Sequence, residues 1–228
     1  MATLRDYILG PRVPKEIILR DPERFKRPKL FLTLAAILVL ISIFLPYWRI
    51  KLYAPQYPQG LVAKVYVNKV TGDVREIDGL NHYIGMRPLE DAAQLERSLS
   101  IYLIVAMALL VWAAIYIHSP FAAVVSLPII LYPLIFAADL YYWLWYFGTH
   151  LDPSAPLSSS VKPFVPPLIG WGHVGQFKVF AMFDIGFWLA VAASILTIIG
   201  LYYHRKAYKA CYEEYIKTGT VCEPTTSS

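Results

Sequence analysis

The stretch FAAVVSLPIILYPLIFAADLYYWLWYF, residues 121–147, carries a single charged side chain, Asp139, and decides the fold class. A helix that crosses a membrane needs roughly 20 consecutive apolar residues, and this run exceeds that length. Three further runs of the same character occupy residues 30–48, 99–117 and 179–203. We therefore expect an all-α membrane protein with four transmembrane helices at these positions.

The composition excludes an ordinary soluble domain. Apolar residues make up 57% of the chain and charged residues only 16%, outside the range of typical globular proteins. The apolar residues are gathered in blocks rather than spaced at amphipathic intervals. The net charge of +5 comes from basic residues at both ends, so we expect a lipid bilayer and not a nucleic acid as partner.

Basic residues flank the first and last apolar runs. Lys and Arg near span ends are retained on the cytoplasmic side, which predicts a multi-pass protein of the cytoplasmic (inner) membrane with both termini in the cytoplasm. Residues 1–29 then form a basic cytoplasmic arm and residues 204–228 a cytoplasmic tail. The basic residues are Arg5, Arg12, Lys15, Arg20, Arg24, Lys26, Arg27 and Lys29 in the arm, and Arg205, Lys206, Lys209 and Lys217 in the tail.

Two long segments are expected outside. Residues 49–98 are too long for a plain connection, and the β-rich runs Leu61–Val67 and Asp73–Ile77 flank turn residues 68–72, which predicts a hairpin. We expect a small β-containing extracytoplasmic cap here. Residues 148–178 are rich in Pro, Ser and Gly and are expected to lie extended, without forming a domain.

Two acids, Asp139 and Asp184, fall within apolar runs. Each costs roughly 2.5–3.5 kcal/mol on insertion scales, so each needs a partner or a wet cavity. One interpretation is structural, with Arg49, Lys178 or a backbone group as partner. The other is a ligand or proton site.

The expected outer side also carries candidate metal ligands. His82 and Met86 lie four residues apart, and Asp139, Trp143, Tyr146 and His150 follow helical spacing on one face. Imidazole with thioether suits Cu(I), and imidazole with carboxylate suits Cu(II). The alternative is that these residues only pack and form hydrogen bonds. The candidate ligands on this side are His82, Met86, His150, Asp152 and His173, with Asp139 and Asp184 as acids of the surrounding shell.

Signatures of catalysis are missing from the sequence. It has no Gly-rich phosphate loop, no Gly-x-Ser-x-Gly elbow and no Cys-x-x-Cys-His haem attachment. His118 and His204 lie at the cytoplasmic edges of the apolar runs, where one haem would be conceivable. We therefore expect a protein that is not an enzyme.

Three segments together resemble a known family. YAPQYPQGL (53–61) with LNHYIGM (80–86), the aromatic segment 139–153 and PPLIG (166–170) are similar to small membrane proteins encoded among nitrous oxide reductase accessory genes. The resemblance points to His82, Met86, His150 and Asp152 as metal ligands, with Asp139 behind them, and it ranks His173 lower. Thr149 separates Gly148 from His150, which is a departure from the family pattern.

The resemblance implies an integral membrane accessory protein that assists maturation or copper supply of an extracytoplasmic copper enzyme such as nitrous oxide reductase, a step in denitrification. Copper is the implied metal, and membrane or periplasmic proteins of that system are the implied partners. The alternative is a non-catalytic docking subunit of a respiratory membrane complex. A third hypothesis is a quinone- or proton-handling subunit that uses Asp139 and Asp184.

Overall fold

The computed structural model describes residues 4–11, 13–157, 160–174 and 177–218, which fall into two compact units. Unit 1 takes in the described parts of residues 1–40, 105–132 and 190–228. Unit 2 takes in the described parts of residues 41–104 and 133–189. The two units are described separately below.

Three helices in the described part of the chain are long and apolar enough to cross a membrane: α5 (Gln94–Ala114), α6 (Phe121–Thr149) and α7 (Ile185–Thr218). The prediction of four transmembrane helices is therefore wrong. The first apolar run belongs to α3 (Pro22–Ser42), whose first turns contain Lys26, Arg27 and Lys29. Its apolar helical part is only about 13 residues, or ~20 Å at 1.5 Å per residue, against roughly 30 Å of hydrocarbon.

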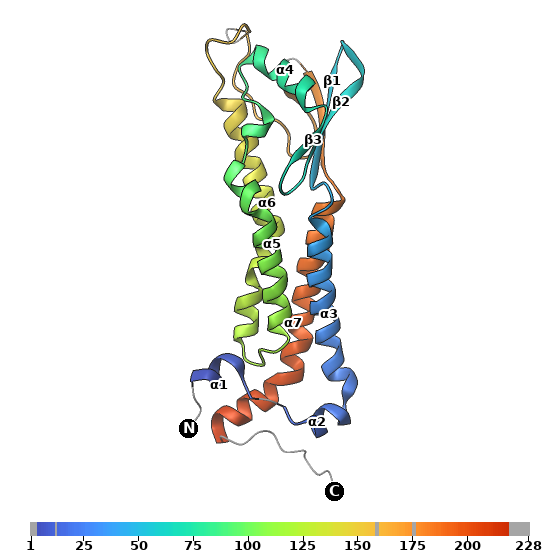
Figure 1. Cartoon of the computed structure of the whole chain (residues 1–228), viewed down its shortest axis with the longest axis vertical. Helices are drawn as coiled ribbons and strands as arrows, with labels where there is room; N and C mark the ends of the chain where they lie inside the picture. Colours follow the sequence, from blue (N-terminus) through green and yellow to red (C-terminus); the bar gives the residue numbers. More distant parts are fainter. Residues whose placement is uncertain (1–3, 12, 158–159, 175–176, 219–228) are drawn as a thin grey trace. The chain divides into compact units, whose positions relative to one another are not determined.

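Unit 2 contains an antiparallel sheet of five strands in the order β3-β2-β1-β5-β4 among the described residues. The prediction of a small cap on an otherwise all-α protein is therefore also wrong. Both outer segments supply strands, and β1 pairs with β5 from Trp48↔Phe183 to Tyr53↔Lys178 (Figure 1). The strands are β1 (Trp48–Ala54), β2 (Tyr57–Val65), β3 (Val70–Gly72), β4 (Gly170–Val174) and β5 (Phe177–Phe183).

The predicted hairpin is half right. Its first arm and turn correspond to β2 and β3, but its second arm, Asp73–Ile77, mostly belongs to helix α4 (Val74–Ile84). Ile77 and Ile84 are buried in α4 and join a hydrophobic cluster with Leu52, Leu61 and Val179 from the sheet. Helix α4 therefore covers one face of the sheet and closes its core, and a short 3-10 helix, Leu89–Asp91, follows it.

Residues 148–178 also differ from the prediction. Part of this segment is irregular, but its end forms β4 and the start of β5, so it is not merely an extended loop. The apolar residues 179–183 continue β5 rather than opening a helix, and α7 begins at Ile185. The strand explains why this run is apolar, because Val179 and Ala181 are fully buried in the sheet.

Unit 1 contains two short helices of the N-terminal arm, α1 (Leu4–Leu9) and α2 (Lys15–Arg20). They accompany α3 up to residue 40, the adjoining parts of α5 and α6 within residues 105–132, and α7 from residue 190 onward. Phe25 of α3 packs edge-on against Tyr208 of α7, and Phe31 stacks on Tyr203 at 5.6 Å. The N-terminal arm and the end of α7 are thus held together.

Candidate functional site

Two segments of unit 2 that carry the family resemblance meet at one place, here called the histidine junction (residues 80–86 with 150–157). The Asp152 N–H donates to the Gly85 carbonyl at 2.8 Å, and the Leu157 N–H donates to the Tyr83 carbonyl at 2.9 Å. Gly85 ends α4 with φ +79°, and a Cβ there would lie 2.6 Å from the Asp152 carbonyl oxygen. Glycine is therefore required by both the backbone conformation and the close approach.

His82 and Met86 take opposite positions at this junction. His82 is exposed on α4, whereas Met86 is only 8% exposed and belongs to the hydrophobic cluster beneath the sheet. The Schellman-type bond from the Met86 N–H to the Asn81 carbonyl, 2.9 Å, turns the chain inward after the helix. The predicted thioether ligand therefore lies in the core, while the imidazole faces solvent.

His150 and Asp152 are both exposed and already hold local contacts. The His150 ring stacks on Tyr146 at 4.4 Å, and its Nδ1 lies 3.1 Å from the Tyr146 carbonyl oxygen. The Ser154 hydroxyl and N–H donate to Asp152 Oδ1 at 2.6 and 2.8 Å. These bonds lower the pKa of Asp152, and His82 contributes in the same direction through its charge, so His82 and Asp152 lie within electrostatic range.

The fit to a metal is incomplete in this arrangement. Among the residues that the structure describes, no group of three or more His, Cys, Asp or Glu side chains is gathered to hold an ion. His82, His150 and Asp152 are exposed side chains on two segments that contact each other. To bind one ion together, these side chains would have to rotate toward it. Met86 would have to leave the hydrophobic cluster.

Asp139 lies half-buried on α6. Glu96 in the first turn of α5 is within electrostatic range of it. One helical turn further along α6, Trp143 packs against the cluster under the sheet and edge-on against Tyr146 at 5.9 Å. The helix face predicted from the spacing is thus a continuous row of side chains that ends at His150.

Asp184 has the structural environment that the first interpretation described. Its Oδ2 lies 3.2 Å from Arg49 Nε, and its Oδ1 accepts the Ile185 N–H at 2.8 Å. Its backbone N–H donates to the Tyr47 carbonyl at 2.8 Å. The side chain is 13% exposed, and these contacts join the end of β5 to the start of α7.

A polar depression of about 690 Å³ lies at the start of α4. Two of its acids are engaged by the fold: Asp73 Oδ2 accepts the Val62 N–H, and Asp78 Oδ1 accepts the Leu89 N–H, both at 2.8 Å. Burial raises the pKa of Asp78. These bonds give both carboxylates a structural role.

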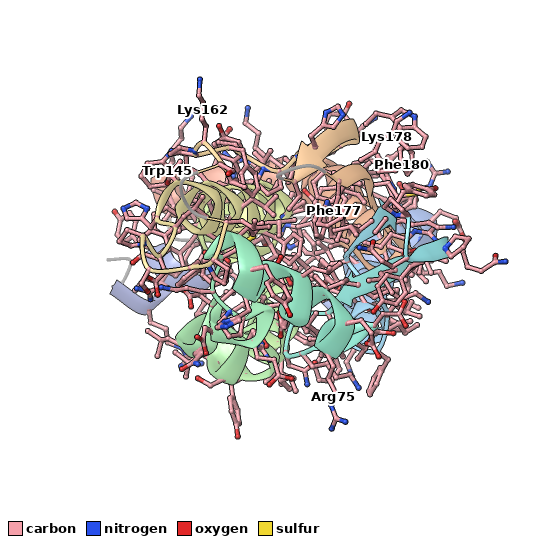
Figure 2. All side chains as sticks on the ribbon, turned by 90° about the horizontal axis from the view of Figure 1, so that it is seen from above. Arg75, Trp145, Lys162, Phe177, Lys178 and Phe180 are labelled. Atoms are coloured by element: carbon pink, nitrogen blue, oxygen red, sulfur yellow. The ribbon has the colours of Figure 1, made fainter. Side chains whose placement is uncertain are left out.

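The outward side of the sheet was missed by the sequence reasoning. Alternation along β1, β4 and β5 turns Leu52 and Val179 inward, and it turns basic and aromatic residues outward. Figure 2 shows Lys178 and Phe180 at the periphery of β5, on the side away from α4. We call this surface the open sheet face; besides Val62 and Met182 it carries Arg49, Lys51, Tyr53, Lys64, Trp171, His173, Lys178 and Phe180.

A second missed cluster lies in unit 1. The His118 and His204 rings are 6.1 Å apart, and both contact Tyr208, at 4.1 and 4.6 Å. His118 Nδ1 lies 2.9 Å from the Pro11 carbonyl oxygen, and the His118 N–H donates to the Leu9 carbonyl at 2.7 Å. The position of these histidines at the ends of two apolar runs was visible in the sequence, but their contact with the N-terminal arm was not.

Comparisons with known proteins give no identification: no family model, no curated protein and no solved structure matches this chain.

Proposed function

We propose that this protein is a membrane-anchored accessory protein that acts by binding rather than by catalysis. It would assist maturation or copper supply of an extracytoplasmic copper enzyme such as nitrous oxide reductase, as the family resemblance implies. The observation that carries the proposal is the histidine junction. Backbone hydrogen bonds join the two histidine-bearing segments of that resemblance, although about 65 residues of chain separate them.

The proposed ligands are His82, His150 and Asp152. Imidazole and carboxylate groups suit Cu(II), and all three side chains are exposed at the junction. Met86 would add a soft ligand for Cu(I) only after leaving its buried position. Asp139 would act indirectly, by fixing the aromatic row of α6 on which His150 stacks.

Copper binding to the purified full chain tests this proposal. His82→Ala and His150→Ala should each reduce the copper retained after desalting, since each removes one imidazole. His173→Ala is the matched control, because His173 is also an exposed histidine of unit 2 but lies on β4, outside the two segments that form the junction. Unchanged copper stoichiometry in both junction variants would remove the proposed site.

We also propose a location in the cytoplasmic (inner) membrane, with both termini in the cytoplasm and unit 2 outside. Because three spanning helices alone would leave the ends on opposite sides, this orientation requires residues 43–47 to complete a further crossing that α3 is too short to make by itself. The basic arm favours this orientation. The contacts between the arm and the end of α7, such as Arg24 Nη2 to the Lys206 carbonyl at 2.9 Å, favour one side for both ends.

Labelling of single cysteines in intact cells decides the orientation. In a variant without the natural cysteines, a cysteine at Gln59 or Ser154 should react with an impermeant maleimide. A cysteine at Glu214 should react only after the cells are opened. Labelling of Glu214→Cys in intact cells would place the end of α7 outside and overturn this orientation.

The docking-subunit alternative is favoured by one observation. The outer end of α6 exposes aromatic side chains, with Tyr141, Tyr142 and Trp145 each at least 40% accessible. Stoichiometric co-purification with haem or Fe–S subunits, together with an absence of bound copper, would favour this alternative over the accessory role.

A further inference from the structure

The open sheet face has an unusual charge pattern. The five strands contain four basic residues, Arg49, Lys51, Lys64 and Lys178, and no Asp or Glu. The nearest acids follow the strands and are engaged: Asp184 pairs with Arg49, and Asp73 accepts the Val62 N–H. The charge of Lys51, Lys64 and Lys178 is therefore left without an acidic partner inside the sheet.

Aromatic side chains fill the space between these cations. Trp171 lies 5.0 Å from Phe180 and 5.7 Å from Tyr53, ring centre to ring centre. Lys178 Nζ lies 4.4 Å above the Trp171 ring, and Lys51 Nζ lies 5.2 Å from the Tyr53 ring. Trp171 remains 58% exposed. A flat face of stacked aromatics and positioned lysines has the composition of a recognition surface, because aromatic residues are enriched at protein interfaces.

We propose that the open sheet face is a docking surface for an acidic patch on a partner protein. Charge complementarity requires a negatively charged surface on the partner, and the aromatic rings supply contact area at low entropic cost. This inference goes beyond the histidine junction and stands even if the junction binds no copper.

The register favours a protein partner over lipid headgroups. From the start of α7 at Ile185, the strands place Phe180 and Lys178 up to about 16 and 23 Å away, at roughly 3.3 Å per residue. The headgroup layer on one side of a bilayer is only about 5–8 Å thick. If the strands run away from the bilayer, lipid headgroups would reach the row of Arg49 and Met182 but not the rows of Trp171 and Lys178.

The size of the face indicates a transient contact. Four strands about 4.8 Å apart and three outward rows give a patch of roughly 400 Å², below the ~800 Å² per partner of stable complexes. Binding is therefore expected in the micromolar range and with strong salt dependence, as suits a carrier that delivers its cargo and leaves.

Fluorescence polarisation with a labelled oligo-glutamate peptide tests the proposal, using the full chain in nanodiscs of phosphatidylcholine. The double variant Lys51→Gln/Lys178→Gln should weaken peptide binding at least ~10-fold, as expected for the loss of two interface charges. Trp171→Ala should weaken it without any change in charge. Lys69→Gln/Lys162→Gln is the matched control, because it removes the same charge from exposed sites of unit 2 that lie outside the strands.

Three outcomes would overturn the proposal. The first is equal weakening by the control pair, which would indicate unspecific attraction. The second is unchanged peptide binding in both the Trp171→Ala variant and the Lys51→Gln/Lys178→Gln variant. The third is loss of peptide binding in phosphatidylglycerol nanodiscs that depends on Lys51 and Lys178, which would assign the face to anionic lipid. Circular dichroism of each variant verifies that the sheet is intact.

Discussion

Asp184 meets two partners where the sheet passes into α7. One carboxylate oxygen accepts the Ile185 N–H, one of the donors that a helix start leaves without a partner, and the other oxygen faces Arg49. Because the Arg49 side chain is 43% exposed, water screens the ion pair, which is worth at most about 1 kcal/mol. The hydrogen bond to the helix start is therefore the larger of the two contributions.

Substitution of Asp184 separates these contributions. Asp184→Ala loses both contacts and should lower the free energy of unfolding by about 1–2 kcal/mol, the usual cost of a lost helix cap. Asp184→Asn keeps an acceptor oxygen and should lose less. Thermal unfolding in detergent measures both variants, and equal losses would mean that the charge, not the acceptor, is what stabilises this site.

Gly79, inside α4, and Gly85, directly after its last residue, provide two contrasting positions for substitution. Gly85→Ala should push residues 150–157 away from the helix end, because its Cβ would lie 2.6 Å from the Asp152 carbonyl oxygen at a positive φ. Gly79→Ala meets no atom within 4 Å and should instead stabilise the helix by roughly 0.5–1 kcal/mol. Hydrogen exchange at the Asp152 and Leu157 amides reads the junction directly. Unchanged protection in Gly85→Ala would contradict the close approach.

Among the elements, the long apolar helices were the most predictable. Residues 121–147 predicted a helix, and α6 spans Phe121–Thr149, since this run has no competing local structure. The prediction of a transmembrane helix over residues 30–48 was wrong because the sequence stays apolar after the helix ends at Ser42. Pro46 disfavours helix in the residue before it, and β1 begins at Trp48.

The second half of the sheet could not be predicted by local reasoning. FKVFAMF, residues 177–183, is followed almost immediately by the apolar start of α7. Neither the spacing of apolar residues nor the composition therefore marks where the strand ends and the transmembrane helix begins. What makes it a strand is pairing with β1, about 125 residues earlier in the chain. The resemblance singled out His82, His150 and Asp152, but the contact between their segments is equally long-range. The open sheet face was hidden for the same reason.

The N-terminal arm should be sensitive to pH through His118. Burial lowers the pKa of His118 below its ordinary value of 6.5, and Lys29 acts in the same direction; the His204 and Tyr208 rings also face it. When the arm is released, His118 takes up a proton more readily than when the arm is docked. Docking is therefore strongest above pH 6.5 and weakens as the pH falls below it.

Hydrogen exchange of the backbone amide at position 118, whose N–H donates to the Leu9 carbonyl, measures this effect. Protection should decrease between about pH 7 and pH 5, the range below the ordinary histidine pKa. His118→Gln, which has no titratable group, is the control and should lose most of this pH dependence. A pH dependence that persists unchanged in His118→Gln would assign it to His204 instead.

Unit 2 as a whole is closed by strands from two distant parts of the chain. A protease site inserted between the exposed residues Lys162 and Pro163 should be cleavable. The two fragments should then remain associated in mild detergent, because β1 pairs with β5 over six registered positions. Co-elution on size exclusion, with separation only in SDS, is the expected result. A matched cut at the exposed Lys69 turn, between β2 and β3, should also leave the fragments joined, whereas dissociation after either cut would contradict the pairing.

During synthesis, β1 leaves the ribosome long before its neighbour β5 exists. During that interval the newly made β1-β2-β3 sheet exposes the unpaired edge of β1, and such edges can pair with other chains and cause aggregation. Until the final helix begins to enter the bilayer, the nascent protein therefore depends on rapid translation or on a chaperone. Slowed translation before codon 177 would therefore be harmful, even with every amino acid unchanged.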